Sequence, residues 1–359
     1  MSTSRAHSAN NNGWADCAEI DNGDGTMTWQ VRPDTQIQPA IHISSEGDTI
    51  KLGAGVFNLV LNQSIDLSSV GVRLCGTVDT SGTPATRINS IDASVIRVVD
   101  NPSPHLSIEN LELHGNTFWS ISRGGGIYCD DSQPLISNCF FNECSADNGN
   151  YNYGGAIFIL AQLTELVPTI TGCAFSQNHA EWGGAIYFYR HTSSPSPVIM
   201  SISSCLFEQN MSDDGGGAIY MYGNAGLDME YCTFRMNASP GGSAGSIENC
   251  NSATTSILGS IFCAPTYDTY YRQHFHGTWT SHGGNCCVDD CTDSDDDGIP
   301  DECQQGCAAD FDCDGVVSAV DLTFILQAWG TPLGDLNGDG TTSGADITIL
   351  LQMWGACGG

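Results

Sequence analysis

The fold is decided by residues 173–187, which read CAFSQNHAEWGGAIY. This stretch joins two short patterns that recur along the chain: Cys-x-Phe-x-x-Asn, and Gly-Gly-Ala-Ile followed by an aromatic residue. The cysteine pattern starts at Cys139, Cys173, Cys205 and Cys232, and the glycine pattern starts at Gly124, Gly154, Gly183 and Gly216. In the first copy, Gly126 replaces the alanine and Cys144 replaces the asparagine. A period of about 30 residues is typical of proteins built from stacked units.

The repeating unit holds only short β runs separated by Gly, Asn and Asp turns, and it lacks the helix of an ankyrin or tetratricopeptide unit. Because such a unit cannot bury its own apolar face, it must stack on its neighbours. The sequence therefore predicts a mainly β fold, a parallel β-helix. Equivalent side chains are then expected about 4.8 Å apart along its axis.

Three ladders of side chains are expected inside and along this stack. Inward cysteines would act as small apolar groups, since a metal site needs ligands that converge on one point. Asparagines suit the turns, where their side chains bond the backbone in left-handed conformations. The predicted ladders are Cys139, Cys173, Cys205 and Cys232; Phe141, Phe175, Phe207 and Phe234; and Asn178, Asn210 and Asn237.

A short helix is expected ahead of the first coil. Ile37, Ala40 and Ile41 share one helical face, after Asp34 or Thr35 as the N-cap. This helix would cap the open end of the stack, which would otherwise be an exposed sheet edge.

The repeat region resembles right-handed parallel β-helix proteins of the pectin-lyase-like class. Its paired glycine and Phe-x-x-Asn motifs resemble those of chlamydial polymorphic outer-membrane proteins and of related planctomycete surface proteins. The likeness covers about residues 110–250. It implies a rod-shaped protein at a cell surface.

The C-terminal segment repeats an acidic loop that is followed by an amphipathic helix. Ca²⁺ needs six to eight oxygen ligands, and a glycine at loop position 6 permits the sharp turn around it. Loop positions 1, 3, 5, 7 and 12 are Asp310, Asp312, Asp314, Val316 and Asp321 in the first loop, and Asp335, Asn337, Asp339, Thr341 and Asp346 in the second. The sequence therefore predicts two bound Ca²⁺ ions.

The two helices after these loops carry apolar residues at matching offsets, so each is expected to show one apolar face to its twin. Each helix is expected to end at a glycine, Gly330 or Gly355. The apolar faces comprise Leu322, Ile325, Leu326 and Trp329 in the first helix, and Ile347, Leu350, Leu351 and Trp354 in the second.

This duplicated loop and helix resembles a type I dockerin, a family that also ends its loops in Asp. The resemblance implies a cohesin-like scaffold protein as partner, although the loops start only 25 residues apart, which leaves little room for a dockerin linker. A third acidic loop resembles a thrombospondin type 3 calcium repeat. Its candidate ligands are Asp293, Asp295, Asp297 and Asp301.

Composition narrows the classes of function. The chain has 10 Lys and Arg against 41 Asp and Glu, a net charge of −31, which argues against binding nucleic acid or anionic lipid through basic residues. No stretch approaches the roughly 18 apolar residues of a membrane span. Seven of the 17 cysteines fall between Cys286 and Cys357, which favours disulfides in an oxidising compartment. We expect an extracellular or cell-surface protein, although the N-terminus lacks the apolar region of a signal peptide.

These features divide the chain into four parts. Residues 1–33 form an N-terminal segment, and residues 34–285 form the β-helix with its capping helix. Residues 286–306 are a cysteine-rich acidic linker, and residues 307–359 are the dockerin-like EF-hand pair.

Catalytic residues are only weakly indicated. Asp130 and Asp131 follow the first glycine motif, whereas Glu181, Asp213 and Asp214 are expected in turns before later ones. Each is more simply a solvated turn residue.

Aromatic residues near the glycine motifs suggest another kind of site. Those after Gly-Gly-Ala-Ile alternate with isoleucine, so they should face outward, where they could stack on sugar rings or on one another. The set is Tyr151, Tyr153, Trp182, Tyr187, Tyr189, Tyr220 and Tyr222.

Two functions remain open at this point. The first is a non-catalytic adhesion rod that binds a glycan or a partner, tethered through its calcium modules. The second is a polysaccharide lyase or glycoside hydrolase carried to a scaffold by the dockerin-like tail, which rests on analogy of fold. We favour the first, because no catalytic set can be assembled from the sequence.

Overall fold

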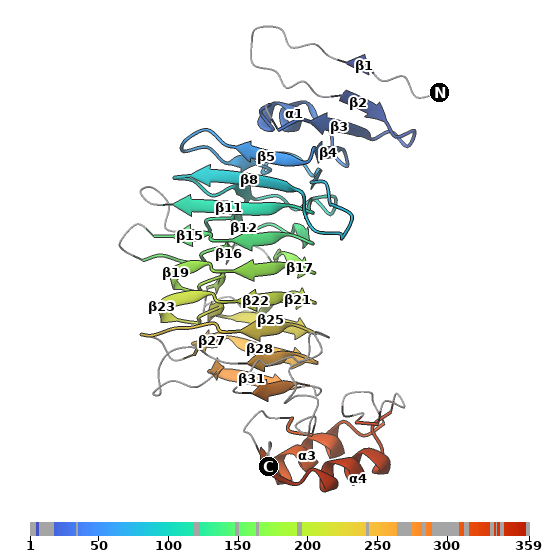
Figure 1. Ribbon diagram of the computed structural model, residues 1–359, viewed down its shortest axis with the longest axis vertical. Coiled ribbons are helices and arrows are strands. Elements are labelled where there is room, and N and C mark those ends of the chain that lie inside the picture. Colours follow the sequence, from blue (N-terminus) through green and yellow to red (C-terminus); the bar gives the residue numbers. More distant parts are fainter. Residues whose placement is uncertain are drawn as a thin grey trace.

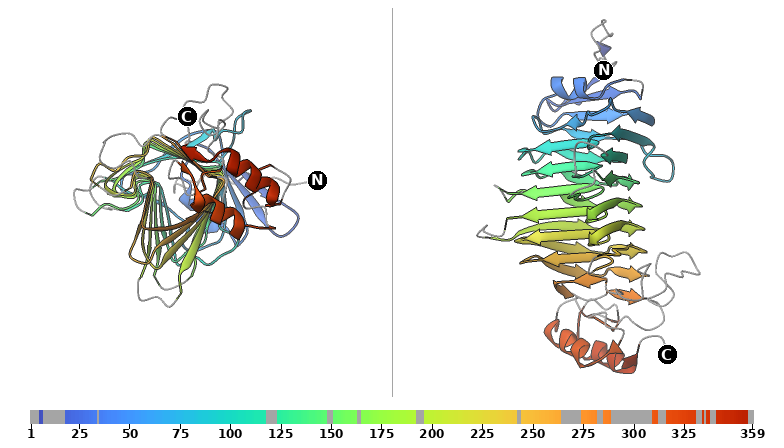
Figure 2. Two further views of the ribbon diagram at one scale, coloured as in Figure 1. Left: turned by 90° about the horizontal axis from the view of Figure 1, so that it is seen from below. Right: turned by 90° about the vertical axis from the view of Figure 1, so that its left-hand side faces the viewer.

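The chain winds into a rod of parallel β-sheets, with a small helical module after it (Figures 1 and 2). The computed structural model describes residues 5–6, 18–33, 35–117, 123–147, 151–162, 165–191, 196–241, 244–263, 274–281, 285–288, 309–311, 316–330, 334, 336–337 and 341–356. The predicted mainly β fold with parallel stacked coils is confirmed.

Three sheets run along the rod, and nearly all their strand pairs are parallel. Sheet A contains β1 Arg5–Ala6, β2 Ala18–Asp21, β3 Met27–Val31, β4 Thr49–Leu52, β7 Arg73–Cys75, β10 Ser107–Glu109, β13 Leu135–Ser137, β17 Thr169–Thr171, β21 Val198–Ser203, β25 Ala225–Glu230, β28 Thr254–Leu258 and β31 Thr278–Ser281. Its first two pairs, β1 with β2 and β2 with β3, are antiparallel.

Sheet B contains β5 Gly55–Asn58, β8 Thr86–Ile91, β11 Glu112–Thr117, β14 Phe140–Asn142, β15 Ser145–Ala146, β18 Ala174–Ser176, β19 His179–Trp182, β22 Leu206–Glu208, β23 Met211–Gly215, β26 Thr233–Arg235, β29 Ile261–Cys263 and β32 Cys286–Val288. Sheet C contains β6 Ile65–Asp66, β9 Ile96–Val99, β12 Ile127–Asp130, β16 Ile157–Ala161, β20 Ile186–Arg190, β24 Ile219–Gly223, β27 Ile247–Cys250 and β30 Phe275–His276.

The strand register confirms that the sequence repeat is the structural repeat. Ile127, Ile157, Ile186 and Ile219 pair in succession in sheet C, so the glycine motifs stack directly on one another. The phenylalanines do the same in sheet B, where five buried rings stack with centroids 4.5–4.7 Å apart. These rings belong to Phe141, Phe175, Phe207, Phe234 and Phe262.

The cysteine ladder also lies inside the rod, as predicted. The backbone N–H of Cys139 donates to Sγ of Cys173 at 3.5 Å, and that of Cys173 donates to Sγ of Cys205 at 3.4 Å. Burial raises the pKa of the Cys144 thiol in the same core to about 12. Such protonated thiols are unreactive. The disulfides expected among the C-terminal cysteines stay a prediction.

The asparagine ladder differs from the prediction in one respect. The side-chain amide of Asn178 donates to Oδ1 of Asn210 at 2.8 Å, and Asn210 donates to Asn237 at 2.9 Å. However, the left-handed residue is the one before each asparagine, with φ of 50–55° at Gln177, Gln209 and Met236. The asparagines are buried, and their amides donate to backbone carbonyl oxygens of the neighbouring coil, those of Phe141 and Phe175.

The paired glycines of the motif serve two separate needs. The first glycine has a positive φ, 66° at Gly183, which a glycine adopts without strain. The second allows neighbouring coils to approach. A Cβ atom on Gly184 would lie 2.2 Å from the carbonyl oxygen of Gly217 in the next coil.

Helix α1, Gln38–Ile43, covers the N-terminal end of the rod (Figure 1). Ala40 and Ile41 are buried in the main core, as predicted. The predicted N-cap is wrong, since the helix begins after Ile37 and has no side-chain cap.

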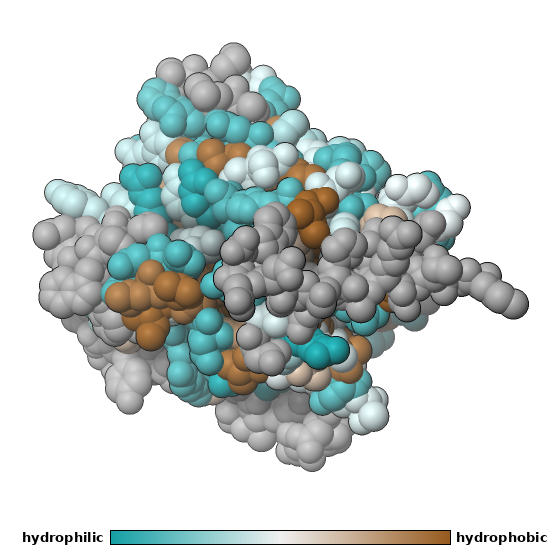
Figure 3. All heavy atoms as spheres, turned by 90° about the horizontal axis from the view of Figure 1, so that it is seen from above, coloured by the Kyte–Doolittle hydropathy of each residue, from teal (hydrophilic) through white to brown (hydrophobic). Residues whose placement is uncertain are grey.

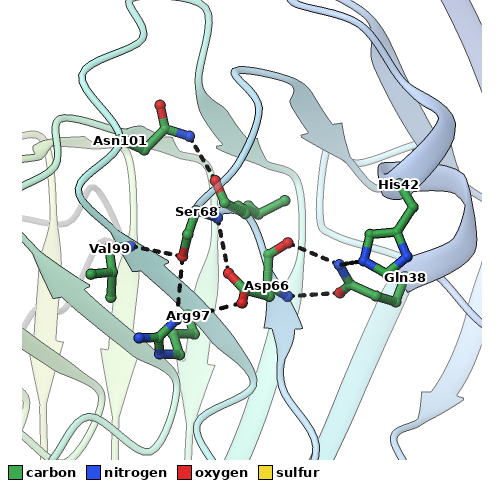
Figure 4. A network of polar contacts seen from close by, with 8 residues as sticks. Gln38, His42, Asp66, Ser68, Arg97, Val99 and Asn101 are labelled. Atoms are coloured by element: carbon green, nitrogen blue, oxygen red, sulfur yellow. Dashed lines mark hydrogen bonds and ion pairs between the residues drawn. The ribbon is translucent and has the colours of Figure 1, made fainter.

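The side chain of Gln38 closes the end of sheet C (Figure 4). Its Nε2 donates to the carbonyl oxygen of Asp66 at 3.0 Å, and its Oε1 accepts from the N–H of Asp66 at 2.8 Å. This amide takes the place of a further strand beside β6, which ends that sheet. Capping an edge in this way prevents unwanted pairing with other chains.

We expect Gln38→Ala to lower the free energy of unfolding by about 1 kcal/mol, because both backbone groups of Asp66 lose their partner. Gln38→Glu keeps the acceptor but not the donor, so its free energy of unfolding should lie between those of the wild type and Gln38→Ala. Urea denaturation followed by circular dichroism measures the difference. Equal stability of the wild type and Gln38→Ala would show that water replaces the amide at no cost.

The C-terminal module contains α3 Ala319–Gln327, α4 Gly344–Gln352, β33 Val316–Val317 and β34 Gly355–Ala356. The residues that follow each helix contact the loop that precedes the other helix. Val317 pairs with Gly355, and the N–H of Gly330 donates to the carbonyl oxygen of Thr342 at 3.0 Å. This exchange joins the two units without a long linker.

Two expectations for this module need correction. The helices end at Gln327 and Gln352, three residues before the predicted glycines, which follow with positive φ. Only Ile325 and Leu350 are fully buried between the helices. Leu322 and Ile347 are half-buried and pack against the same core. About half of the surface of each of the remaining four predicted residues is exposed, so the apolar faces extend beyond the contact: Leu326, Trp329, Leu351 and Trp354.

Candidate functional site

The outer surface of sheet C carries columns of aromatic side chains, which we call the aromatic face. Successive ring centroids from Tyr128 through Phe158 and Tyr187 to Tyr220 lie 5.3–5.7 Å apart, with interplanar angles of 10–18°. A second column places Tyr189 and Tyr222 5.7 Å apart.

The predicted outward orientation of these rings is confirmed. Ile186 and Phe188 belong to the core of the rod, whereas Tyr187 packs into a separate apolar cluster on the other side of the sheet. The rings of the first column are nevertheless largely buried, with Tyr187 exposed by 6% and Tyr220 by 9%. Because each ring stacks on the next, this column packs coil against coil and offers its ring faces to little else.

A more open group lies at the corner between sheets B and C. Arg123, Tyr153 and Trp182 pair in succession by isolated parallel bridges, so they form a third column. The Trp182 ring stacks with both Tyr153, at 5.2 Å, and Tyr151, at 6.1 Å. We call these four residues the aromatic corner. Tyr151 is its most accessible ring, with 65% of its surface exposed.

Arg123 was not among the residues expected from the sequence, because only its pairing with Tyr153 reveals its place. Its guanidinium carbon lies 5.0 Å from the ring centroid of Phe158 and 5.9 Å from that of Tyr153. A guanidinium held over aromatic rings is a preformed donor for an acidic or hydroxylated ligand.

Glu181, a candidate catalytic residue, holds the aromatic corner in place. Its Oε2 accepts from the N–H of Asn152 at 3.1 Å, and the N–H of Trp182 donates to the carbonyl oxygen of Asn152 at 3.0 Å. These bonds fix the backbone between Tyr151 and Tyr153. Glu181 lies on strand β19 and not in a turn, which corrects the sequence-based expectation.

Asp130 and Asp131 have different environments. Asp130 faces outward, where Tyr128 donates to its Oδ2 at 3.2 Å and burial raises its pKa. Asp131 is 3% exposed and in a left-handed turn, and its Oδ1 accepts from the N–H of Gln162 at 3.0 Å. They therefore do not act as a pair on one substrate.

Asp213 and Asp214 lie on strand β23, so their placement in a turn was also wrong. Both side chains are exposed, and His179 Nε2 lies 3.2 Å from Oδ1 of Asp213. The five candidate carboxylates are thus spread over strands of two sheets and a turn. We see no pair among them arranged as the acid and base of a hydrolase.

In the C-terminal module, both loops are closed by the aspartate at position 12. Oδ1 of Asp321 accepts from the N–H of Phe311 at 2.7 Å, and its Oδ2 accepts from that of Ser318, also at 2.7 Å. Asp346 repeats this arrangement with Leu336 and Ser343, at 2.9 and 2.7 Å. The serines are also the helix N-caps, a role that the sequence analysis did not assign.

These carboxylates are buried in a part of the chain that has no basic residues. Asp321 and Asp346 are 0% exposed, and Asp310, at position 1 of the first loop, is 2% exposed. Burial opposes the ionisation of Asp346, but backbone N–H groups outweigh it and lower its pKa. No Lys or Arg follows Arg272. The module therefore gathers buried negative charge without a basic side chain of its own.

Three of the other predicted loop ligands lie among the described residues. Val316 is on β33 and 40% exposed, Thr341 is exposed, and the N–H of Asn337 donates to Oδ1 of Asp346 at 3.1 Å. Asp312, Asp314, Asp335 and Asp339 lie outside the described residues, as do Asp293, Asp295, Asp297 and Asp301 of the third acidic loop. Within the described residues, no three His, Cys, Asp or Glu side chains gather closely enough to hold a metal.

The fold and these columns define a parallel β-solenoid with a repeated glycine motif. The Chlamydia polymorphic membrane protein repeat family matches at residues 172–189 and 204–222, which span the cysteine and glycine patterns of two successive coils. The chain is also 30% identical over 179 residues to metabotropic glutamate receptor-like protein R of Dictyostelium discoideum. That match takes in 44% of this chain but only 10% of the other protein. No solved structure matches this chain. Among the described residues, no helix is long and apolar enough to cross a membrane.

Proposed function

We propose that this protein is a surface or extracellular rod that binds a glycan or a glycan-bearing partner without chemical turnover. Polymorphic-membrane-protein-like repeats support a surface role. The observation that carries the binding role is the aromatic corner, which combines an exposed ring, Tyr151, with the guanidinium of Arg123. Aromatic rings beside a few fixed polar groups are typical of ligand sites.

The scattered carboxylates favour binding over catalysis. Glu181 and Asp131 already accept backbone N–H groups, and Asp213 faces solvent beside His179. Glycoside hydrolysis needs two carboxyl groups facing each other across the scissile bond. The lyase or hydrolase alternative therefore has no specific observation in its favour.

We further propose that the C-terminal module binds two Ca²⁺ ions and attaches the rod to a second protein, as the likeness to dockerins suggests. The buried carboxylates of Asp310, Asp321 and Asp346 support the first part, since no basic side chain of the module balances them. The exposed Trp329 and Trp354 support the second. The third acidic loop, with Asp293 and Asp297, is proposed as a further calcium site on its sequence alone.

The aromatic corner can be tested with a matched pair of substitutions. Tyr151 and Tyr231 are both exposed, by 65% and 61%, and both have a positive φ, of 57° and 53°. Only Tyr151 belongs to the corner. We expect Tyr151→Ala to weaken binding on a glycan array about tenfold, or about 1.4 kcal/mol, and Tyr231→Ala to leave it unchanged. Equal binding by both variants and the wild type would count against this site.

A further inference from the structure

The N-terminal end of the rod leaves one of its three sheets open. Sheet A continues through β3 and β2 at this end, and sheet C is closed by Gln38. Sheet B ends on β5, which pairs with β8 alone. In the part of the chain that the structure describes, no strand pairs with this edge, and only its first residue, Gly55, is approached by the ring of Pro33.

The geometry of β5 shows which of its groups are open. The N–H groups of Gly55 and Leu59 donate to Ala85 and Asn89, on the β8 side, at 2.9 Å each. In a parallel ladder, alternate residues direct their N–H and C=O groups to one neighbour. Val56 and Asn58 therefore direct theirs away from β8.

Apolar side chains surround this edge. Val60 and Leu61, in the turn after β5, are 51% and 58% exposed, and Ile91, at the end of β8, is 57% exposed. The N–H of Asn62 donates to the carbonyl oxygen of Ile91 at 3.2 Å, so this turn lies against the end of β8. Val56 adds a side chain that is 46% exposed. Figure 3 views the molecule from this end and shows apolar surface between polar regions.

The distribution of charge along the chain determines how a second copy can approach this edge. The first 123 residues hold seven of the ten basic residues but only 13 of the 41 acidic ones. The rest of the chain therefore carries most of the net charge of −31. Two copies that meet at their N-terminal ends repel each other least, and their acidic C-terminal segments point apart.

We propose that β5 pairs antiparallel with β5 of a second copy of this chain, edge to edge beside helix α1, to form a twofold dimer of rods. A strand that meets its own copy antiparallel forms a self-complementary interface. The pairing satisfies the outward groups of Val56 and Asn58 and covers Val60, Leu61 and Ile91. An open edge with exposed apolar residues is the feature that otherwise leads to aggregation.

Sedimentation velocity of the full chain tests this proposal. At high concentration the wild type should sediment with twice the 38.1 kDa mass of one chain. The dimer fraction should rise at high salt, which screens the repulsion between the copies. Asn58→Pro removes the outward N–H donor, whereas Asn58→Ala keeps it. We expect the proline variant to dimerise at least about tenfold more weakly and the alanine variant to dimerise like the wild type.

A second pair of variants tests the same edge in case Asn58→Pro does not fold. Val56→Lys places a charge at the edge, and Ile199→Lys places the same charge at a residue that is 53% exposed on β21, away from this end. Only Val56→Lys should weaken the dimer. A wild type that stays monomeric at every concentration and salt, or a dimer that both lysine variants leave intact, overturns the proposal.

Discussion

Adding Ca²⁺ to the metal-free chain is expected to stabilise its C-terminal module by about 2.7 kcal/mol once calcium exceeds its dissociation constant about a hundredfold. The reason is electrostatic. Asp310, Asp321 and Asp346 are buried in a part of the chain without basic residues, so a cation bound in each loop would offset the charge of the carboxylates there. Differential scanning calorimetry with calcium and with a chelator measures the shift of the unfolding transition.

The test compares two double variants that remove the same amount of charge, one in the C-terminal module and one in the rod. Asp321→Asn together with Asp346→Asn should abolish the calcium response, because the loops lose their closing carboxylates. Asp213→Asn together with Asp214→Asn removes two exposed carboxylates of the rod and should leave the response unchanged. If titration of calcium into the wild type gave neither heat nor added stability, the module would not be a calcium site.

Gly184→Ala is expected to destabilise the rod by about 3 kcal/mol, although it adds only a methyl group. The new Cβ would lie 2.2 Å from the carbonyl oxygen of Gly217 and 2.6 Å from that of Met211. Both atoms belong to the backbone of the next coil, so relief requires the coils to separate. Guanidinium denaturation followed by circular dichroism measures the loss.

Gly53→Ala is the matched control for this substitution. Its φ is not in the left-handed region, and the nearest atom to a new Cβ would be the carbonyl oxygen of Val31, at 3.6 Å. We expect a change of about 0.5 kcal/mol or less. Equal effects of the two substitutions would mean that the second glycine of the motif is not set by the approach of the coils.

The repeated features of the fold could be predicted because stacking turns one sequence pattern into one spatial ladder. Phe141, Phe175 and Phe207 hold the same place in successive units, 34 and 32 residues apart, and therefore lie above one another. Left-handed turns were harder to place: asparagine is a common left-handed residue, yet here the preceding glutamine or methionine takes that conformation. The buried amide ladder outweighs the local preference.

The site was less predictable, because it depends on residues that do not repeat. The outward orientation of Tyr187 follows from alternation with Ile186. Alternation does not predict how far the rings cover one another. It does not predict the position of Arg123 either, which only the coil-to-coil bridges reveal. In the same way, Glu181 and Asp213 are in strands because the chain extends sheet B between the Phe-x-x-Asn and glycine motifs.

The most direct test of a binding role without chemistry is to incubate the calcium-loaded chain with pectin, alginate and sulfated glycans and to analyse both retention and products. We predict that at least one of these polymers is retained by the wild type, more weakly by Tyr151→Ala, and that no shorter fragments appear. Release of fragments by the wild type, lost in Asp130→Asn, would contradict the account and identify the protein as an enzyme.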